Sequence, residues 1–535
     1  MSGAGRSAFW RTTDSPGQAP AATPRCTRIS SRRVDSRVLL IVGIIVAACP
    51  SLTRGQGDCE VETRAAEVRA FIDAVAGGIE TLQIPEDIHD LPQPRLPDGE
   101  IDPLYEITEA RVELGRLLFH DPTFTILTGF PETELTASCA TCHFVEAGFR
   151  AGQAQSLGVG ARRFLDESGT SVREPIPSLW AIDEGPTGDF NGDSVDNPPI
   201  VSPSINMVAY FDELLWNGSS RQESPEEMPP VERQARDAFG AHRLDDTAFE
   251  QVPEYVPLFE DAFPELVGEP IEVLIDMFQI IRAISAYERT VVSNHSRWDA
   301  FLAGDDLALT CQELNGAELF WGEAGCSVCH GGPALGSTTY HALGVAEHAA
   351  IPDGEHDLGR FGVTSDPADR YKFRAMTVRN LKGAGPFFHG GSAATVEDVV
   401  RYKNAAAADQ KVDNLSPLFV PLGLSEQEIL DLTAFLSDAL NDPDMERFGA
   451  DSLPSGLCVP NDDLPSRYDA GCEVFGDFDA DGDVDLIDYG RFQRCFNSPQ
   501  AHLGEECAPM DRDGDEDVDL DDFAAFQSDL NASPG

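Results

Sequence analysis

Two short stretches decide how this chain folds: Cys139-Ala140-Thr141-Cys142-His143 and Cys326-Ser327-Val328-Cys329-His330. Each places two thiols three residues apart and an imidazole directly after the second thiol. Thiols at this spacing form thioethers with the vinyl groups of a porphyrin, and the adjacent His reaches its iron. A zinc site built from two Cys-x-x-Cys pairs is the alternative, but it leaves the adjacent His in both motifs unexplained. The two motifs therefore predict two covalently bound haem c groups, held by Cys139, Cys142, His143, Cys326, Cys329 and His330.

The composition is that of a globular protein with an unusual excess of acid. Of 535 residues, 41% are hydrophobic and 24% are charged, and 92 Asp and Glu against 38 Lys and Arg give a net charge of −54. A surface of this sign repels nucleic acid, so we expect no nucleic-acid partner. It attracts calcium and basic proteins, or it simply keeps an exported protein soluble.

Residues 1–58 have the pattern of a leader segment. Arg28, Arg32, Arg33 and Arg37 precede the apolar run 38–48, which has the length of a signal-peptide core and is too short for a comfortable membrane span. We therefore expect export to the periplasm or the cell surface, with lipid attachment at Cys49 as an alternative. Outside the leader and the two motifs, the even number of remaining cysteines is compatible with disulfides whose pairing is left open: Cys59, Cys311, Cys458, Cys472, Cys495 and Cys507.

Helical periodicity dominates the rest of the chain. Apolar spacing predicts helices over 60–78, 109–119, 271–293, 310–321 and 425–440. The stretch 158–203 is rich in Gly, Pro, Asp and Ser and is expected to be loop. Because alternating β-branched runs are scarce, we expect a mainly α protein. Its predicted parts are a cytochrome c-like haem domain over 59–300, a second over 301–450, a linker over 451–471 and a small helical calcium-binding domain over 472–530.

The calcium-binding domain is predicted from an acidic duplication. The segment 477–488 recurs as 511–522, with Asp at loop positions 1, 3, 5 and 12 and a Val at position 8. This is the spacing of calcium-binding loops, and it is too regular for an unstructured acidic tail. At the turn position the first loop has Gly482, whereas the second loop has Glu516, which predicts a weaker second loop. The candidate ligands are Asp477, Asp479, Asp481, Asp483, Asp488, Asp511, Asp513, Asp515, Asp517 and Asp522. The repeats resemble dockerin type I modules, which implies a cohesin-like or surface partner.

Residues 107–440 resemble a known family. The matching stretches are Leu114-Gly-Arg-Leu-Leu-Phe-His-Asp-Pro122, Ser138-Cys-Ala-Thr-Cys-His143, Ile284-Ser-Ala-Tyr-Glu-Arg-Thr290, Phe373-Arg374 and Gly385-Pro-Phe-Phe-His-Gly-Gly391. In order and spacing they are similar to the bacterial diheme cytochrome c peroxidases and the MauG-type diheme enzymes. The resemblance implies that the N-terminal haem reacts with hydrogen peroxide. The C-terminal haem would receive electrons from a small cytochrome c or cupredoxin.

The resemblance also implies site residues at matched positions. Trp216 matches the tryptophan between the two haems, and Gln234 matches a glutamine near the peroxide. The family's catalytic Glu has no counterpart in the following stretch, where His242 is the candidate substitute. Val159 stands where many relatives carry a second His ligand, which predicts a five-coordinate first haem. Val201 replaces the Asn of an interdomain calcium site, so that ion is not expected.

The sixth ligand of the second haem is left open. The family places Met or Tyr fourteen residues after the position of His389, and this chain has Lys403 there with Tyr402 adjacent. A deprotonated Lys or a tyrosinate would each hold the potential of the iron below that of a Met-ligated haem. The leading interpretation is therefore a diheme peroxidase. The alternatives are a MauG-like oxidase of a protein or organic substrate and a non-enzymatic diheme electron carrier.

Overall fold

The structure is a computed structural model. It describes residues 59–125, 137–143, 145–152, 161–165, 171–175, 200–224, 227–242, 244–347, 356–450, 452–457 and 486–496, with single positions at 510, 518, 520, 522, 523 and 526. The leader 1–58 with Cys49, the position Val159 and most of the predicted linker lie outside these ranges. So do the candidate calcium ligands Asp477, Asp479, Asp481, Asp483, Asp511, Asp513, Asp515 and Asp517.

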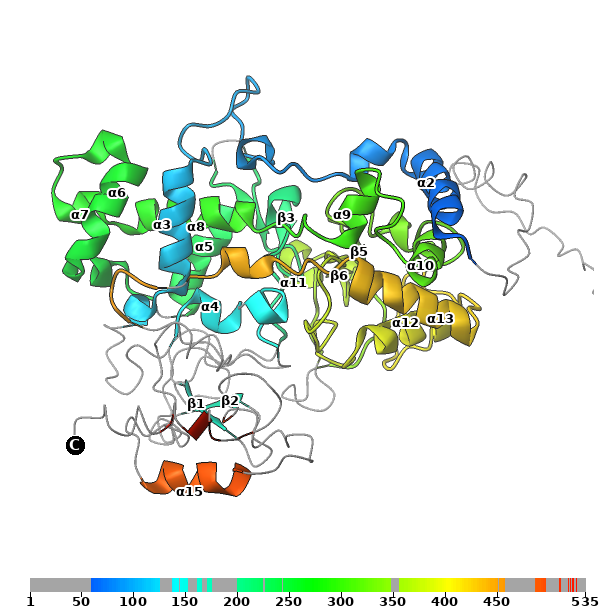
Figure 1. The fold of residues 1–535 in the computed structure, drawn as a ribbon. Helices are drawn as coiled ribbons and strands as arrows, with labels where there is room; N and C mark the ends of the chain where they lie inside the picture. Colours follow the sequence, from blue (N-terminus) through cyan, green and yellow to red (C-terminus); the bar gives the residue numbers. More distant parts are fainter. Residues whose placement is uncertain are drawn as a thin grey trace, which may run out of the picture. The chain divides into compact units, whose positions relative to one another are not determined.

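The described chain is mainly helical, as predicted (Figure 1). Its α-helices are α2 (Val61–Ala76), α3 (Glu109–His120), α4 (Cys139–Cys142), α5 (Pro230–Ala241), α6 (Val256–Ala262), α7 (Ile271–Leu274), α8 (Met277–Thr290), α9 (Arg297–Leu302), α10 (Cys311–Trp321), α11 (Phe361–Thr364), α12 (Val396–Ala405), α13 (Glu426–Ala434) and α15 (Leu486–Cys495). A π-helical turn, Phe435–Ala439, continues α13. Three antiparallel strand pairs join β1 (Ala161–Leu165) to β2 (Ser171–Pro175), β3 (Glu213–Leu214) to β4 (Ser220–Arg221) and β5 (Tyr340–His341) to β6 (Phe373–Arg374).

Side-chain caps explain where several helices begin. Thr310 and Glu313 form a reciprocal capping box at the start of α10, and Ser425 and Glu428 form another at α13. The same chemistry divides the helix predicted over 271–293. The carboxylate of Asp276 accepts the backbone N–H groups of Phe278 and Gln279 and starts α8 anew. Periodicity does not register this cap, because the apolar spacing continues across it.

The expected loop over 158–203 contains the β1–β2 hairpin. The pair is antiparallel, with Ala161 opposite Pro175 and Leu165 opposite Ser171. Composition alone predicted loop there because Gly, Pro, Asp and Ser surround both strands. The pairing partners lie close in sequence, so the hairpin forms without a recognisable alternating pattern.

One apolar cluster surrounds the first haem motif. It joins residues of α3, α5, α6 and α8, among them Leu118, Phe259 and Ile284, all at most 3% exposed. Helices α3 and α8 pack so closely that a Cβ on Gly115 would lie 1.9 Å from the carbonyl oxygen of Ala283. Burial of this apolar face holds the two helices together and places the segment that follows α3 beside α8.

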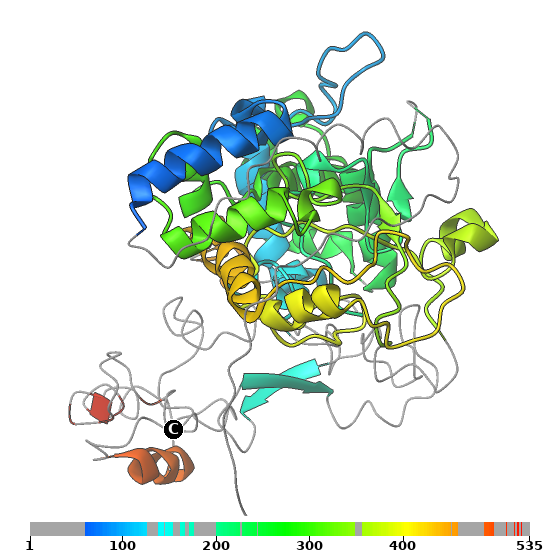
Figure 2. The same cartoon turned by 90° about the vertical axis from the view of Figure 1, so that its right-hand side faces the viewer.

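A second apolar cluster surrounds the second motif. Helices α2, α9, α10 and α13 meet there (Figure 1 and Figure 2). The rings of Trp298 and Trp321 stack between them, and Phe435 packs against both. Helix α2 thus packs against α10, although it precedes α3 in the sequence. Conversely, Met445 and Leu453 pack in the first cluster. Each cluster therefore contains residues from both sides of position 300, the predicted boundary between the two haem domains.

A disulfide between Cys59 and Cys311 ties the start of α2 to the start of α10, with their Cα atoms 6.3 Å apart. It closes a loop with a sequence separation of 252 residues. We expect Cys59→Ser to lower the free energy of unfolding by about 2–4 kcal/mol, because the unfolded chain regains the freedom of that loop. Denaturant unfolding of Cys59→Ser, Cys311→Ser and the double variant measures this. All three should lose the same amount, since each removes the same bond, and additive losses would contradict the prediction.

The described part of the C-terminal segment has a small apolar cluster of its own. Phe492 from α15 packs with Val518 and Phe526, and Asp522 is 1% exposed beside them. Asp488 lies within α15. Cys495 is disulfide-bonded. Among the described residues no group of three or more His, Cys, Asp or Glu is arranged to hold a metal ion. Within the same ranges, no helix is both long and apolar enough to cross a membrane.

Candidate functional site: two haem-binding segments

The second haem motif follows α10 and forms a short 3-10 turn, Cys326–Val328. His330 comes next, and its Nδ1 lies 2.9 Å from the carbonyl oxygen of Met376. A carbonyl only accepts, so Nδ1 carries the proton and Nε2 is left as the ligand atom. Burial lowers the pKa of His330 to about 4, and the charge of Lys403 acts in the same direction. The imidazole is therefore neutral at physiological pH, as an iron ligand must be.

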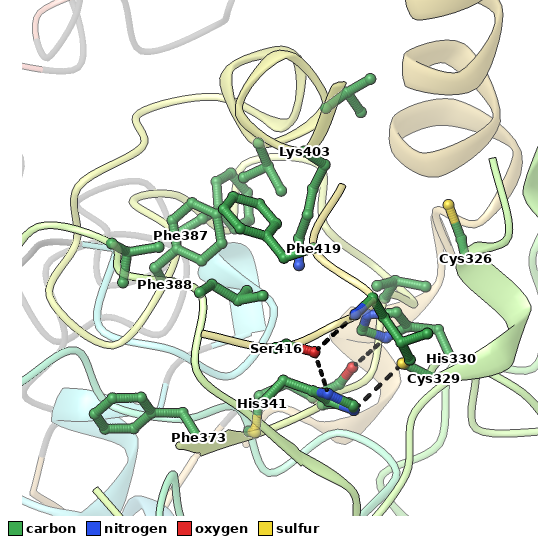
Figure 3. Close-up of a pocket in the computed structure, with 18 of the residues that line it drawn as sticks. Cys326, Cys329, His330, His341, Phe373, Phe387, Phe388, Lys403, Ser416 and Phe419 are labelled. Atoms are coloured by element: carbon green, nitrogen blue, oxygen red, sulfur yellow. Dashed lines mark hydrogen bonds between the residues drawn. The ribbon is translucent and has the colours of Figure 1, made fainter. Parts of the chain in front are cut away.

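A cavity of about 500 Å³ opens beside this motif (Figure 3). Cys326, Cys329 and His330 line it together with an apolar wall made of Phe320, Val345, Phe373, Phe387, Phe388, Val400, Phe419 and Leu432. All four motif cysteines carry thiols rather than disulfides. Burial raises the pKa of Cys326 to about 12. Two thiols, a neutral imidazole and a largely apolar lining suit a covalently attached porphyrin, so the residues present fit a haem.

Lys403 and Tyr402, the two candidate sixth ligands, are placed differently. Lys403 lines the cavity from α12, and Figure 3 shows its side chain pointing into the pocket beside Phe419. Burial lowers the pKa of Lys403 to about 8. The Tyr402 hydroxyl instead donates to the carbonyl of Leu343 at 3.0 Å, and the Tyr402 ring stacks on Phe419. Tyr402 does not line the cavity among the residues that the structure describes.

Two buried arginines also line this cavity and were missed by sequence reasoning. Arg150 follows the first haem motif by a few residues, and Arg374 lies in β6. They are 7% and 5% exposed. Arg374 stands in one of the stretches that carry the family resemblance, but Arg150 has no motif to mark it.

The first haem motif forms the single turn α4, in a capping box between Ser138 and Thr141. His143 ends this turn, and its Nδ1 lies 3.1 Å from the carbonyl oxygen of Phe149. Burial lowers the pKa of His143 to about 4. The same logic as for His330 leaves Nε2 available to iron. Gly148 holds the returning loop at φ 61°, where a Cβ would lie 2.8 Å from the carbonyl oxygen of Asn380.

The candidate proton-transfer residues lie on or next to α5. His242 is the C-terminal cap residue of this helix, and it contributes to the lowering of the pKa of His143, which is mainly due to burial. Gln234 lies in the middle of α5 and is partly exposed. The same helix carries Glu232, which sequence reasoning missed. Glu232 is fully buried and forms a two-pronged ion pair with Arg289 of α8, at 2.5 and 2.6 Å.

Trp216 lies in the β3–β4 hairpin and lines the cavity beside the second haem motif. Its indole N–H donates to the carbonyl of Val201 at 2.7 Å, and its own carbonyl accepts from the backbone N–H of Arg374 at 2.8 Å. The Trp216 ring lies 6.4 Å from the ring of His389, measured between centroids. The hairpin depends on Gly218 at φ 71°, where a Cβ would collide with the Tyr340 hydroxyl. The predicted bridging tryptophan is thus docked against the segment that carries the second motif.

A second buried carboxyl, Glu288 of α8, lies near the first motif. Burial raises the pKa of Glu288 to about 8, while Arg289 opposes this shift and Glu232 adds to it. The folded protein thus keeps a proton that the unfolded chain loses above about pH 4.5, so stability falls as the pH rises towards 8. We expect Glu288→Gln to abolish this loss, worth up to about 1.4 kcal/mol between about pH 6 and pH 7. Urea unfolding across this range measures it, and parallel pH profiles for both proteins would contradict it.

Comparison with known proteins finds relatives among the cytochrome c peroxidases. The family model described as di-haem cytochrome c peroxidase matches residues 109–307. The cytochrome c551 peroxidase of Pseudomonas aeruginosa is 30% identical over 297 residues, covering 55% of this chain and 71% of that protein. The cytochrome-c peroxidase IdrP1 of Denitromonas iodatirespirans is 29% identical over 374 residues, covering 64% and 84%. The methylamine utilization protein MauG of Methylorubrum extorquens is 27% identical over 354 residues, covering 65% and 82%. With two haem-attachment motifs and relatives of this kind, the chain belongs to the di-haem cytochrome c peroxidase and MauG family and is an oxidoreductase of the peroxidase type.

Proposed function

We propose that this chain is a diheme peroxidase that reduces hydrogen peroxide to water. The reaction consumes two electrons and two protons per peroxide and yields two waters. A small cytochrome c or cupredoxin would deliver the electrons one at a time to the second haem segment. The observation that carries the proposal is Trp216, which comes from the segment that precedes the second motif and lines the cavity beside it. Such a residue supports electron transfer between two haem sites.

The haem groups would supply the redox-active iron, and the chain's own residues hold and orient them. Cys139 and Cys142, and likewise Cys326 and Cys329, would anchor each group covalently. The carbonyls of Phe149 and Met376 hold the protons of the two ligand imidazoles at Nδ1. His242, at the C-terminal end of α5, is the proposed group that moves a proton between the peroxide oxygens, and Gln234 of the same helix is the proposed second residue near the peroxide.

Lys403 is the proposed sixth ligand of the second haem. It is supported by its place in the cavity lining and by the lowered pKa of its amine, which favours the neutral form that a ligand needs. An amine ligand would keep this haem low-spin and hold its potential below that of a Met-ligated haem. The first haem is proposed to be five-coordinate, because Val at position 159 cannot ligate iron.

Stopped-flow mixing of the reduced holoprotein with hydrogen peroxide tests the proposed reaction. A peroxidase should lose its high-spin absorption rapidly and then turn over with a reduced cytochrome c. Rapid loss without turnover, followed by oxidation of a protein substrate, would instead support the MauG-like alternative. An inert spectrum would identify an electron carrier and overturn the proposal. A low-spin bis-His signal from the first haem in the resting oxidised protein would overturn the open site.

The C-terminal segment is proposed to be a dockerin-like module that binds calcium through its two acidic loops and a cohesin-like or surface partner. The proposal is supported by the duplicated Asp spacing and by the packing of Phe492, Val518 and Phe526. Export to the periplasm or cell surface, with lipid attachment at Cys49 as an alternative, is proposed from the leader pattern. Calcium titration of the full chain should add helical circular dichroism, and Asp477→Asn with Asp511→Asn should abolish the gain. No calcium response in the wild type would overturn the module.

A further inference from the structure

We propose that Arg150 and Arg374 together bind the two carboxylate groups of the haem attached at Cys326 and Cys329. We also propose that Arg150 thereby links the loading of this haem to the position of His143. The inference rests on the proposed function insofar as it needs a haem at the second motif. It adds two cation sites and a coupling between the two haem segments.

Both guanidinium groups lack the partners that buried charges require. Nη1 of Arg150 donates to the carbonyl of Ala384 at 3.1 Å, but its Nε and Nη2 make no hydrogen bond within the described chain. Nε of Arg374 donates to the carbonyl of Leu215 at 3.2 Å, while its Nη1 is likewise unpaired within the described ranges. A buried guanidinium without a counter-charge is costly, so both groups call for an anion.

The surrounding rings hold each guanidinium in place without neutralising it. Arg150 lies over the ring of Phe387 at 5.5 Å, and Arg374 lies over the ring of Phe211 at 4.5 Å. Burial lowers the pKa of both arginines to about 10. The direction of that shift agrees with cations that have been taken out of water and not fully paired.

Two of the nearby carboxylates, Glu347 and Glu213, are already engaged elsewhere. Glu347 lines the same cavity, but its oxygens lie 3.4 Å from His389 and 3.4 Å from His356. Glu213 lies near enough to Arg374 to raise its pKa, yet its carboxylate pairs with Arg360 at 2.8 Å and accepts from Tyr340. Within the described residues, these two carboxylates therefore leave both guanidinium groups open to an anion from outside the chain.

A haem combines the apolar surface and the negative charges that match the lining of this cavity. Its porphyrin is apolar and flat, as the phenylalanine-rich wall requires, and it carries two carboxylates for the two unpaired guanidiniums. Lys403, a third basic side chain in the lining, is the proposed ligand of the iron. Both arginines, Trp216 and the two thiols line one cavity, so the carboxylates of the attached haem would be bound by groups that border the tryptophan.

Arg150 connects the proposed carboxylate site to the first haem segment. Its neighbour Phe149 provides the carbonyl that orients the imidazole of His143. A carboxylate bound to Arg150 would therefore hold the loop that fixes the first ligand. Arg150 is a positioning residue in this scheme, since it acts on the first haem through Phe149 and His143.

The test compares the full-length holoproteins of the wild type, Arg150→Gln, Arg150→Lys and Arg374→Gln by spectroelectrochemical titration. A nearby cation favours the reduced haem, so both Gln variants should have a lower potential at the second haem, and Arg150→Lys should lie between Arg150→Gln and the wild type. Haem content should stay at two per chain, because the thioethers are untouched. Arg150→Gln alone should also change the spectrum of the first haem. Arg401→Gln is the matched control, because Arg401 lies on α12, pairs with Glu397 and Glu426, and should leave both potentials unchanged.

The outcomes separate this inference from the proposed reaction. Unchanged second-haem potentials in Arg150→Gln and Arg374→Gln, with wild-type peroxide turnover, would overturn the carboxylate site alone. Lowered potentials with an unchanged first-haem spectrum in Arg150→Gln would overturn the coupling through Phe149. A wild type with two haems and lowered potentials in both Gln variants, but without peroxide turnover, would support the carboxylate site and overturn the peroxidase. If Arg150→Gln does not fold, Arg374→Gln and Arg150→Lys still decide the carboxylate site.

Discussion

Replacing Lys403 with alanine should convert the second haem from low-spin to high-spin, whereas Tyr402→Phe should leave its spectrum unchanged. The reason is geometric. The Lys403 side chain enters the cavity beside the second motif, while the Tyr402 hydroxyl is occupied by the carbonyl of Leu343. Loss of the amine leaves the iron without its sixth ligand. Electronic absorption and electron paramagnetic resonance of the oxidised holoproteins measure the change, with the first haem of each sample as an internal reference.

A third variant sharpens this prediction. Lys403→Met should keep the second haem low-spin but raise its midpoint potential, because a soft thioether stabilises the ferrous state better than an amine does. Lys403→Arg keeps a long basic side chain, but a guanidinium stays protonated and cannot ligate, so this variant should resemble the alanine variant. A spectral change in Tyr402→Phe and none in Lys403→Ala would reverse the ligand assignment.

Replacing Glu232 with glutamine should lower the free energy of unfolding by about 3–5 kcal/mol. Glu232 and Arg289 form a buried ion pair whose side chains are 1% and 4% exposed. Removal of the carboxylate charge leaves the guanidinium buried without a counter-charge between α5 and α8, which is the costly half of such a pair. Denaturant unfolding of the wild type and the variant in the same buffer measures the loss.

The double variant Glu232→Leu with Arg289→Met provides the decisive comparison. Since both charges are removed together, it should recover most of the lost stability, because apolar side chains of similar volume replace a desolvated pair. The exposed pair of Arg236 and Asp237 on the same helix offers a matched control, and Asp237→Asn should cost under about 1 kcal/mol. Equal losses at Glu232 and Asp237 would show that burial of the pair contributes nothing.

The local features of this protein could be predicted because their causes are local. The attachment of haem needs only two thiols and an imidazole within five consecutive residues, so both motifs are readable without a fold. Helix α10 begins directly after Thr310 because Thr310 and Glu313, three residues later, form a reciprocal cap. The same reasoning limits the prediction at Asp276, where a cap divides a continuous apolar pattern that periodicity alone reads as one helix.

The distinction between Lys403 and Tyr402 needed the tertiary structure. Adjacent residues on a helix point about 100° apart, and on α12 Lys403 lines the cavity whereas Tyr402 does not. Sequence spacing allows either residue as the ligand, but the rotation of α12 is decided by the packing of its apolar face. Val396 and Val400 are buried in the second cluster, and that packing turns Lys403 inward.

Sequence alone was enough to identify the haem chemistry, the family resemblance and the mainly helical fold, because each depends on residues that are close together in the chain. Contacts between distant segments were decided only by the tertiary structure. Helix α2 joins α10 through the Cys59–Cys311 bond, and Arg150 reaches the cavity of the second motif. The physical reason is that an apolar face or a buried charge selects its partner by burial and complementarity over the whole molecule, and no local pattern records which distant surface satisfies it.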